Sequence, residues 1–251
     1  YLKASVGLMP TFAYLGVSYG VFVVIGAQLL KVPPPGYRPA GWDPPAADTV
    51  KTMGADFTTG EMLRTPQFYL MWAAYLFGTA AGLMIIANAM PIATVQGLTG
   101  ALAASAVMII SLFNAAGRII WGTISDRLGR TKVLKIIFLI CGATMLSLKM
   151  LTGVMILTGV ALVGFCFGGF LAVYPSLTAD YFGTKAYGAN YGCVFLAYGT
   201  GAVAGPMLYD LIKSPVPGVL SSTPMVVSGL ACLIGLLLMF ALKPPNLGKS
   251  H

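Results

Sequence analysis

Ionisable side chains are scarce in this 251-residue sequence. Only 9% of the residues are charged, Asp and Glu together number 7, and the one histidine, His251, is the last residue. This composition excludes an ordinary soluble domain, in which about 25% of residues are charged. No Asp, Glu or His falls deep within an apolar run, and a Ser or Cys without a base is a poor nucleophile. We therefore expect a protein that is not an enzyme, and the lack of a Walker loop argues against an ATP-driven pump.

Long apolar runs dominate what is present. Hydrophobic residues make up 57% of the chain and the mean hydropathy is +0.84. Runs of about 18 residues or more are candidate membrane-spanning helices. The sequence predicts an all-α integral membrane protein, multi-pass in the lipid bilayer, with seven transmembrane helices. They lie at residues 4–30, 67–94, 101–124, 133–148, 152–177, 189–212 and 219–242. The four cysteines fall inside these runs, so we expect core thiols and neither disulfides nor metal ligands.

A polar, proline-rich segment separates the first span from the other six. It contains Pro33–Tyr37 and Gly41–Pro45, a composition typical of an extended, solvated linker. The predicted organisation has four parts: a transmembrane helix at residues 1–30, a linker at 31–66, a six-helix part at 67–243 and a tail at 244–251. The chain begins at Tyr1 and not at Met, so we expect that an N-terminal part precedes it.

The distribution of Lys and Arg orients the spans. Eleven of the 15 lie in the linker, after the third and fifth spans and after the seventh span; Lys3, Lys149 and Lys213 lie on the other side. The positive-inside rule then places the linker and the C-terminus in the cytoplasm, in what we expect to be the plasma (inner) membrane. Because these positions explain the net charge of +8, the charge does not require nucleic acid as a partner.

One cation lies far inside an apolar span. Arg118 follows Asn114 by one helical turn and Ser111 by two, so the three form a polar stripe on the run at residues 101–124. A charge near the bilayer centre costs about 2.5–3.5 kcal/mol on insertion scales, so it needs a partner, water or a ligand. The planar guanidinium fits a carboxylate, which predicts an anion site. The alternative is a structural ion pair with an acid outside this chain.

A second motif follows the third span. Gly122, Asp126, Arg127, Gly129 and Arg130 have the spacing G-x-x-x-D-R-x-G-R. This resembles the loop signature of the major facilitator superfamily, in which two six-helix halves rock about a central site. The glycines would allow close approach and a tight turn, and Asp126 would pair with a basic residue or a helix N-terminus in a conformational latch. The alternative is a merely solvated basic loop.

The resemblance extends to one family. Residues 26–42, residues 81–88 and Pro91–Ala93 are similar to the oxalate:formate antiporter family, which includes close monocarboxylate-transporter relatives. By this resemblance the chain corresponds to a partial major facilitator fold: the sixth helix, the cytoplasmic linker and the C-terminal half. The expected partners are a small carboxylate substrate, the missing N-terminal half and the lipid bilayer. No cofactor is expected.

The family pattern also proposes site residues. Its eighth helix carries the substrate-binding arginine, which matches Arg118, with Asn114 beside it. In the eleventh helix, Tyr198 stands where the oxalate exchanger is expected to have a second cation, a lysine, and Tyr191 shares a face with it. One cation suits one carboxylate, so the substitution favours monocarboxylates over oxalate. Tyr174 and Asn88 are further candidates, although aromatic residues at helical spacing commonly serve packing alone. Gly201, Gly205 and Pro206 resemble the superfamily's packing and gating stretch.

These observations favour secondary transport of small organic anions, such as formate, lactate or pyruvate, by alternating access. Oxalate:formate exchange is the nearest alternative. A seven-helix receptor or sensor is a different class, disfavoured by the latch motif, the long linker and the intramembrane arginine. Because no acidic residue lies deep in a span, a carboxylate proton relay is not expected in this part of the protein.

Overall fold

The computed structural model describes residues 6–30, 37, 56–216, 218–219 and 221–245. The chain divides into two compact units, residues 1–51 and 52–251. In the first unit, α2 (Leu8–Leu29) is a helix of 22 residues, none of them buried. The greater part of the predicted linker (31–36 and 38–55) and most of the predicted tail (246–251) lie outside the described residues.

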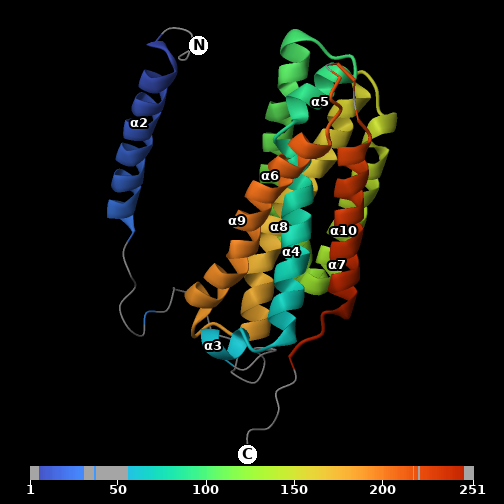
Figure 1. The fold of residues 1–251 in the computed structure, drawn as a ribbon. Coiled ribbons are helices and arrows are strands. Elements are labelled where there is room, and N and C mark those ends of the chain that lie inside the picture. Colours follow the sequence, from blue (N-terminus) through green and yellow to red (C-terminus); the bar gives the residue numbers. More distant parts are fainter. Residues whose placement is uncertain (1–5, 31–36, 38–55, 217, 220, 246–251) are drawn as a thin grey trace, which may run out of the picture. The chain divides into compact units, whose positions relative to one another are not determined.

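The second unit is a helical bundle (Figure 1). Its elements are α3 (Thr59–Met62), α4 (Pro66–Ile86), α5 (Ala89–Val95), α6 (Gly100–Leu128), α7 (Arg130–Ser147), a 3-10 turn (Leu148–Met150), α8 (Met155–Phe182), α9 (Tyr187–Ile212) and α10 (Thr223–Ala241). Together with α2, seven helices among the described residues are long and apolar enough to cross a membrane. The predicted all-α, seven-span class is confirmed.

Helix α8 forms the core of the bundle. The buried share of its apolar span is 72%, whereas the corresponding share is 22% in α6 and 22% in α9. Helix α8 packs mainly on α6 and α7, α4 packs on α9 and α10, and α10 also packs on α7. The sparse burial of α6 and α9 leaves one face of each uncovered within this unit. Those two faces carry the polar and aromatic residues on which the candidate site depends.

Glycines bring α6 and α8 into close backbone contact. A Cβ added at Gly168 of α8 would lie 3.0 Å from the Arg118 backbone nitrogen and still closer to the Asn114 carbonyl oxygen. A Cβ at Gly164 would lie 2.7 Å from the Ile110 carbonyl oxygen, and one at Gly117 would collide with the backbone of α8. Small residues at four-residue spacing let helix backbones approach in this way. The backbone of α6 at the polar stripe is therefore held by α8.

The second predicted span is broken into two helices. The sequence predicted one helix over 67–94, whereas α4 ends at Ile86 and α5 begins at Ala89. Pro91 explains the break, because it has no N–H to donate to the carbonyl of Ala87 and its ring crowds that carbonyl. At the break, the Asn88 side-chain amide donates to the Met84 carbonyl at 2.9 Å and satisfies one backbone acceptor.

The end of the predicted linker packs against the bundle. The Asp56 carboxylate accepts hydrogen bonds from the backbone N–H groups of Thr184 and Lys185, at 2.9 and 3.1 Å, in the connection between α8 and α9. The Phe57 N–H donates to the Phe182 carbonyl at 3.0 Å, and the two rings meet edge to face at 5.7 Å. This element, Asp56 to Met62, we call the docked segment.

The docked segment lies within residues 31–66, which were predicted as a solvated linker. The described part of that stretch is not solvated throughout, because Met62 is fully buried. The proline-rich composition that predicted a solvated linker is confined to the residues before Asp56. Beyond it, Thr58 and Glu61 form a reciprocal capping box that starts α3. A helical turn whose N-terminal N–H groups are satisfied by this reciprocal capping can pack where an extended proline-rich chain cannot.

Candidate functional site

Arg118 lies in an open hollow on the exposed face of α6. The hollow has a volume of ≈ 340 Å³ and is lined by Ser111, Asn114, Ala115 and Arg118. The Arg118 Nε–H donates to Asn114 Oδ1 at 3.2 Å, which orients the guanidinium along the stripe. The Ser111 hydroxyl donates to the Val107 carbonyl at 2.9 Å, so its oxygen stays available as an acceptor. The predicted polar stripe is therefore a continuous surface of the helix.

The guanidinium keeps donors for a ligand. Within the described part of the chain no carboxylate lies within 4.0 Å of Arg118, and Asn114 takes one of its five N–H groups. At 1.5 Å per residue, Arg118 lies about 15 Å from the end of α6 at Leu128, a depth near the middle of a bilayer. A cation with free donors at that depth can bind an anion by charge-assisted hydrogen bonds.

The aromatic residues of α9 form a stacked ladder. Tyr187 stacks on Tyr191 with centroids 5.8 Å apart, Tyr191 contacts Phe195 at 5.5 Å, and Phe195 stacks on Tyr198 at 4.9 Å. The predicted common face of Tyr191 and Tyr198 is present, and Phe195 lies between them. Tyr198 also contacts Phe167 of α8 at 6.3 Å.

Two predicted site residues lie away from the hollow. Tyr174 is fully buried, stacks on Tyr75 of α4 at 4.0 Å and directs its hydroxyl to the Met239 sulfur at 4.0 Å. Asn88 uses its amide at the break between α4 and α5. Sequence reasoning placed both by helix position alone. It could not see that α4 and α10 cover Tyr174, or that Asn88 bonds the backbone of the helix turn before it. Neither belongs to the hollow in this structure.

The signature residues join α6 to α7. Most of the motif is helical, because α6 continues through Leu128, so the expected loop is reduced to Gly129. That residue has φ 90° and ψ 141°, a conformation that favours glycine. Gly122 does not mediate a close approach as expected: a Cβ there would only touch the Ala172 Cβ at 3.9 Å. The tight turn thus depends on one of the two glycines.

Arg130 is the centre of the charged cluster at this end of the bundle. Its guanidinium pairs with Asp126 one turn earlier at 2.5 Å and with Asp180 at the end of α8 at 3.6 Å. It also donates to the Ser125 hydroxyl at 2.5 Å. Arg127 is exposed and makes no ion pair among the described residues. The cluster links α6, α7 and α8. The side chains of Asp126 and Asp180 are 64% and 44% exposed, whereas the Arg130 side chain that they share is 19% exposed.

The glycines of α9 pack against α4. A Cβ at Gly201 would lie 2.9 Å from the Ala80 backbone nitrogen, and one at Gly205 would collide with the Ala80 carbonyl oxygen. Pro206 lies inside α9 and removes one helical hydrogen bond. This is the close packing expected for the predicted stretch, whereas its part in gating is a proposal.

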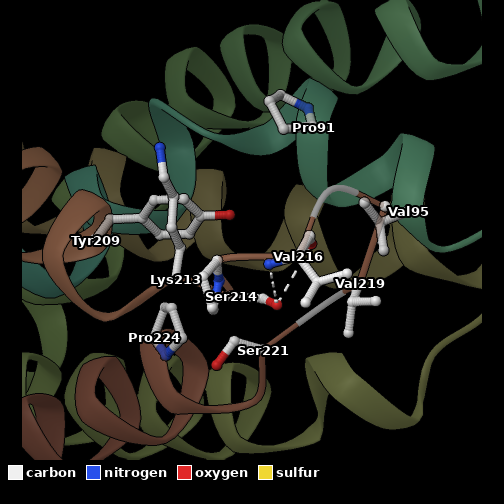
Figure 2. Close-up of a pocket in the computed structure, with 11 residues that line it drawn as sticks. Pro91, Val95, Tyr209, Lys213, Ser214, Val216, Val219, Ser221 and Pro224 are labelled. Carbon is white, nitrogen blue, oxygen red and sulfur yellow. Dashed lines mark hydrogen bonds between the residues drawn. The ribbon is translucent and has the colours of Figure 1, made fainter.

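A second pocket lies between α5, the end of α9 and the start of α10. It has a volume of ≈ 310 Å³, and Figure 2 shows the Tyr209 hydroxyl directed towards Val216. Its one lining cation, Lys213, is already paired with Asp210 at 2.6 Å, and this hydrogen bond raises the pKa of Lys213. A cation that is already paired attracts an anion weakly. We therefore favour the Arg118 hollow over this pocket as the candidate anion site. Among the described residues, no group of three His, Cys, Asp or Glu side chains can hold a metal ion.

Known proteins are similar to this chain over most of its length. The sequence matches the Major Facilitator Superfamily over residues 2–206 and 82–250. It is 32% identical over 203 residues to the oxalate:formate antiporter of Oxalobacter formigenes, which covers 79% of this chain and 46% of that protein. It is 32% identical over 208 residues to the uncharacterized MFS-type transporter YhjX of Escherichia coli (strain K12), covering 80% and 49%. The chain spans about half the length of these relatives.

Proposed function

Because this chain belongs to the major facilitator superfamily, we propose that it forms the C-terminal half, with the preceding helix, of a secondary transporter for small organic anions. The single observation that carries the anion assignment is Arg118 in its hollow, with donors free and Asn114 orienting its Nε–H. The remaining statements of this subsection are proposals built on that observation.

Binding begins with charge. An arginine offers a carboxylate a planar pair of N–H donors, and such charge-assisted hydrogen bonds are shorter and about twice as strong as neutral ones. The hollow supplies further polar groups in Ser111 and Asn114, and an apolar floor at Ala115. A small anion that docks here offsets the cost of holding Arg118 within the membrane, which is the physical reason for the cation at this depth.

The substrate we propose is a monocarboxylate of the formate, lactate or pyruvate class. Tyr198 occupies the position at which an oxalate exchanger is expected to carry a second cation. It stacks on Phe195, with Phe167 near its other side. A neutral hydroxyl cannot compensate a second carboxylate as a lysine can. Oxalate:formate exchange is the competing proposal, since the relative from Oxalobacter formigenes bears that name at 32% identity.

Alternating access would use the uncovered faces of α6 and α9. Only 22% of each apolar span is buried within this unit, so a second helical half can pack there and close over the hollow. The Arg130 cluster would act as the latch at the cytoplasmic end, holding α6, α7 and α8 together in one state and parting in the other. Both carboxylates of the cluster are partly exposed, so water can replace Arg130 as their partner when the helices part.

The experiment is counterflow uptake of labelled formate, lactate and oxalate into proteoliposomes that contain the full-length gene product. Arg118→Lys keeps the charge but removes the fork, so uptake efficiency should fall about 10- to 100-fold. Arg64→Lys, the same change at an exposed position before α4, should transport as the unmodified protein does. Efficient oxalate uptake would favour the exchanger instead, and uptake unchanged by Arg118→Lys would refute the anion site.

A further inference from the structure

The docked segment bridges the corner at which α8 ends and α9 begins. Besides the contacts of Asp56 with the α8–α9 connection, the Phe57 backbone bonds both helices. Its N–H donates to the carbonyl of Phe182, the last residue of α8, at 3.0 Å, and its carbonyl accepts from the Asn190 side-chain amide of α9 at 3.0 Å. Figure 1 shows α3 at this end of the bundle, and α3 packs on α9. The segment thus ties α8, the connection and α9 together.

Helix α9 lacks a side-chain cap of its own. Its N-cap is Ala186, which makes no side-chain hydrogen bond, and α9 packs mainly on α4 and only slightly on α8. Its close backbone contact with α4, at Gly201 and Gly205, begins about 20 Å from its first residue at 1.5 Å per residue. The Asp56 carboxylate bonds two N–H groups just before this helix, where it also interacts favourably with the helix dipole. The docked segment is therefore what anchors the start of α9 beside the end of α8.

One buried atom indicates that this anchor is only partly stabilised. Asn190 is fully buried, and its Oδ1 has no hydrogen-bond partner within the described part of the chain. Reversing the amide would not help, because it would turn that oxygen towards the Phe57 carbonyl, which is another acceptor. A buried polar atom without a partner destabilises the state that buries it. The closed arrangement therefore loses part of the stability that its hydrogen bonds contribute, which favours an anchor that can open.

We propose that the docked segment is a releasable strap that sets the position of the start of α9. When it is closed, it holds the first turns of α9 beside α8; when it is released, these turns move away and water reaches the Asn190 oxygen. Gly183, with φ 77° between the two helices, is the hinge. The first turns carry Tyr187 and Tyr191, so the strap decides where the aromatic ladder begins. It directly follows the predicted linker in sequence, so a movement of the linker reaches α9 through it. This inference goes beyond the proposed function, because it requires no anion at Arg118.

The test is the rate at which a maleimide labels a buried cysteine in the purified full-length gene product. In a Cys193→Ser background, Val194→Cys places a thiol at a fully buried position of α9, one turn after Asn190. Asp56→Ala removes the acceptor of two hydrogen bonds, and we expect it to speed labelling about tenfold by favouring the released state. Asn190→Leu keeps a similar volume but leaves the Phe57 carbonyl without its donor, and it should speed labelling to a similar extent.

Asp210→Ala, which removes an exposed carboxylate at the other end of α9, is the matched control and should leave the labelling of Val194→Cys unchanged. A thiol at Ala103→Cys, buried in α6, reports general unfolding and should label equally slowly in every variant. Labelling of Val194→Cys that Asp56→Ala leaves unaltered would overturn the strap, and so would an equal acceleration at Ala103→Cys. Because this measurement needs no substrate, its failure would leave the anion site of Arg118 untouched, which the uptake assay tests by itself.

Discussion

The position of Arg118 depends on a glycine of another helix, and this gives the most exacting prediction. In α8, Gly168 lies against the backbone of α6 at Asn114 and Arg118, and a Cβ there would lie 3.0 Å from the Arg118 nitrogen and closer still to the Asn114 carbonyl oxygen. Both obstacles are backbone atoms, which cannot rotate away as a side chain can. Gly168→Ala must therefore separate the two helices locally, by about 1 Å, if an ordinary contact is to be restored.

The expected cost follows from that displacement. Overpacking a close contact destabilises a protein by about 1–3 kcal/mol, which the remaining α6–α8 interface can absorb. A shift of about 1 Å in a binding group can lower activity about 100-fold. Counterflow uptake of the transported carboxylate, with the amount of reconstituted protein matched, measures this loss, and thermal unfolding in detergent measures the stability.

Gly192→Ala is the matched control. Gly192 lies within α9, and nothing lies within 4 Å of an added Cβ. Alanine there should be tolerated. Because alanine has a higher helix propensity than glycine, it should increase the stability of the protein by about 0.5–1 kcal/mol. If Gly168→Ala transported as well as Gly192→Ala, the close contact with α8 would not be what positions Arg118, and the reasoning from backbone proximity would be refuted.

Three further predictions concern the end of the bundle that carries α3. Asp126→Asn removes the charge that faces Arg130 and should change the transport rate more than KM in uptake assays, whereas equal effects on both would count against a latch. Asp56→Asn weakens the two backbone hydrogen bonds of the docked segment and should speed amide hydrogen exchange in the α8–α9 connection; unaltered exchange would show that the docking is incidental. Hydrogen bonds from Thr58 hold the pKa of Glu61 below its ordinary value of 4.5, so its contribution to stability is present above that pH and is lost on acidification. Glu61→Gln should accordingly have a lower melting temperature than the unmodified protein near neutral pH. The two melting temperatures should converge in acid, once the Glu61 carboxyl of the unmodified protein is protonated, and a difference that persists in acid would contradict this.

The spans and the polar stripe could be predicted because they depend on local pattern. Length and hydropathy identify membrane helices, and a spacing of three and four residues puts Ser111, Asn114 and Arg118 on one face. The Gly-x-x-x-Gly spacing of Gly164 and Gly168 was a further signal that the sequence offered, and it predicts the tight contact of α8 with α6.

The rest required knowledge of neighbours distant in sequence. The burial of Tyr174 follows from its stacking on Tyr75, a hundred or so residues earlier, and no periodicity within one helix reveals that pair. The docked segment depends on Asp56 meeting backbone N–H groups beyond α8. The extension of α6 to Leu128 follows from the lack of Gly and Pro between residues 125 and 128, and the sequence could have predicted it.

Substrate protection of a cysteine placed in the hollow tests the central claim most directly. In a Cys193→Ser background, which removes the one thiol that is not fully buried, Ala115→Cys places a reactive group beside Arg118. Labelling by a maleimide should slow in the presence of the transported carboxylate, but not with equal chloride, and Leu112→Cys on a neighbouring exposed face should label at a constant rate. Labelling of Ala115→Cys that is unaffected by any transported carboxylate would contradict an anion site at Arg118.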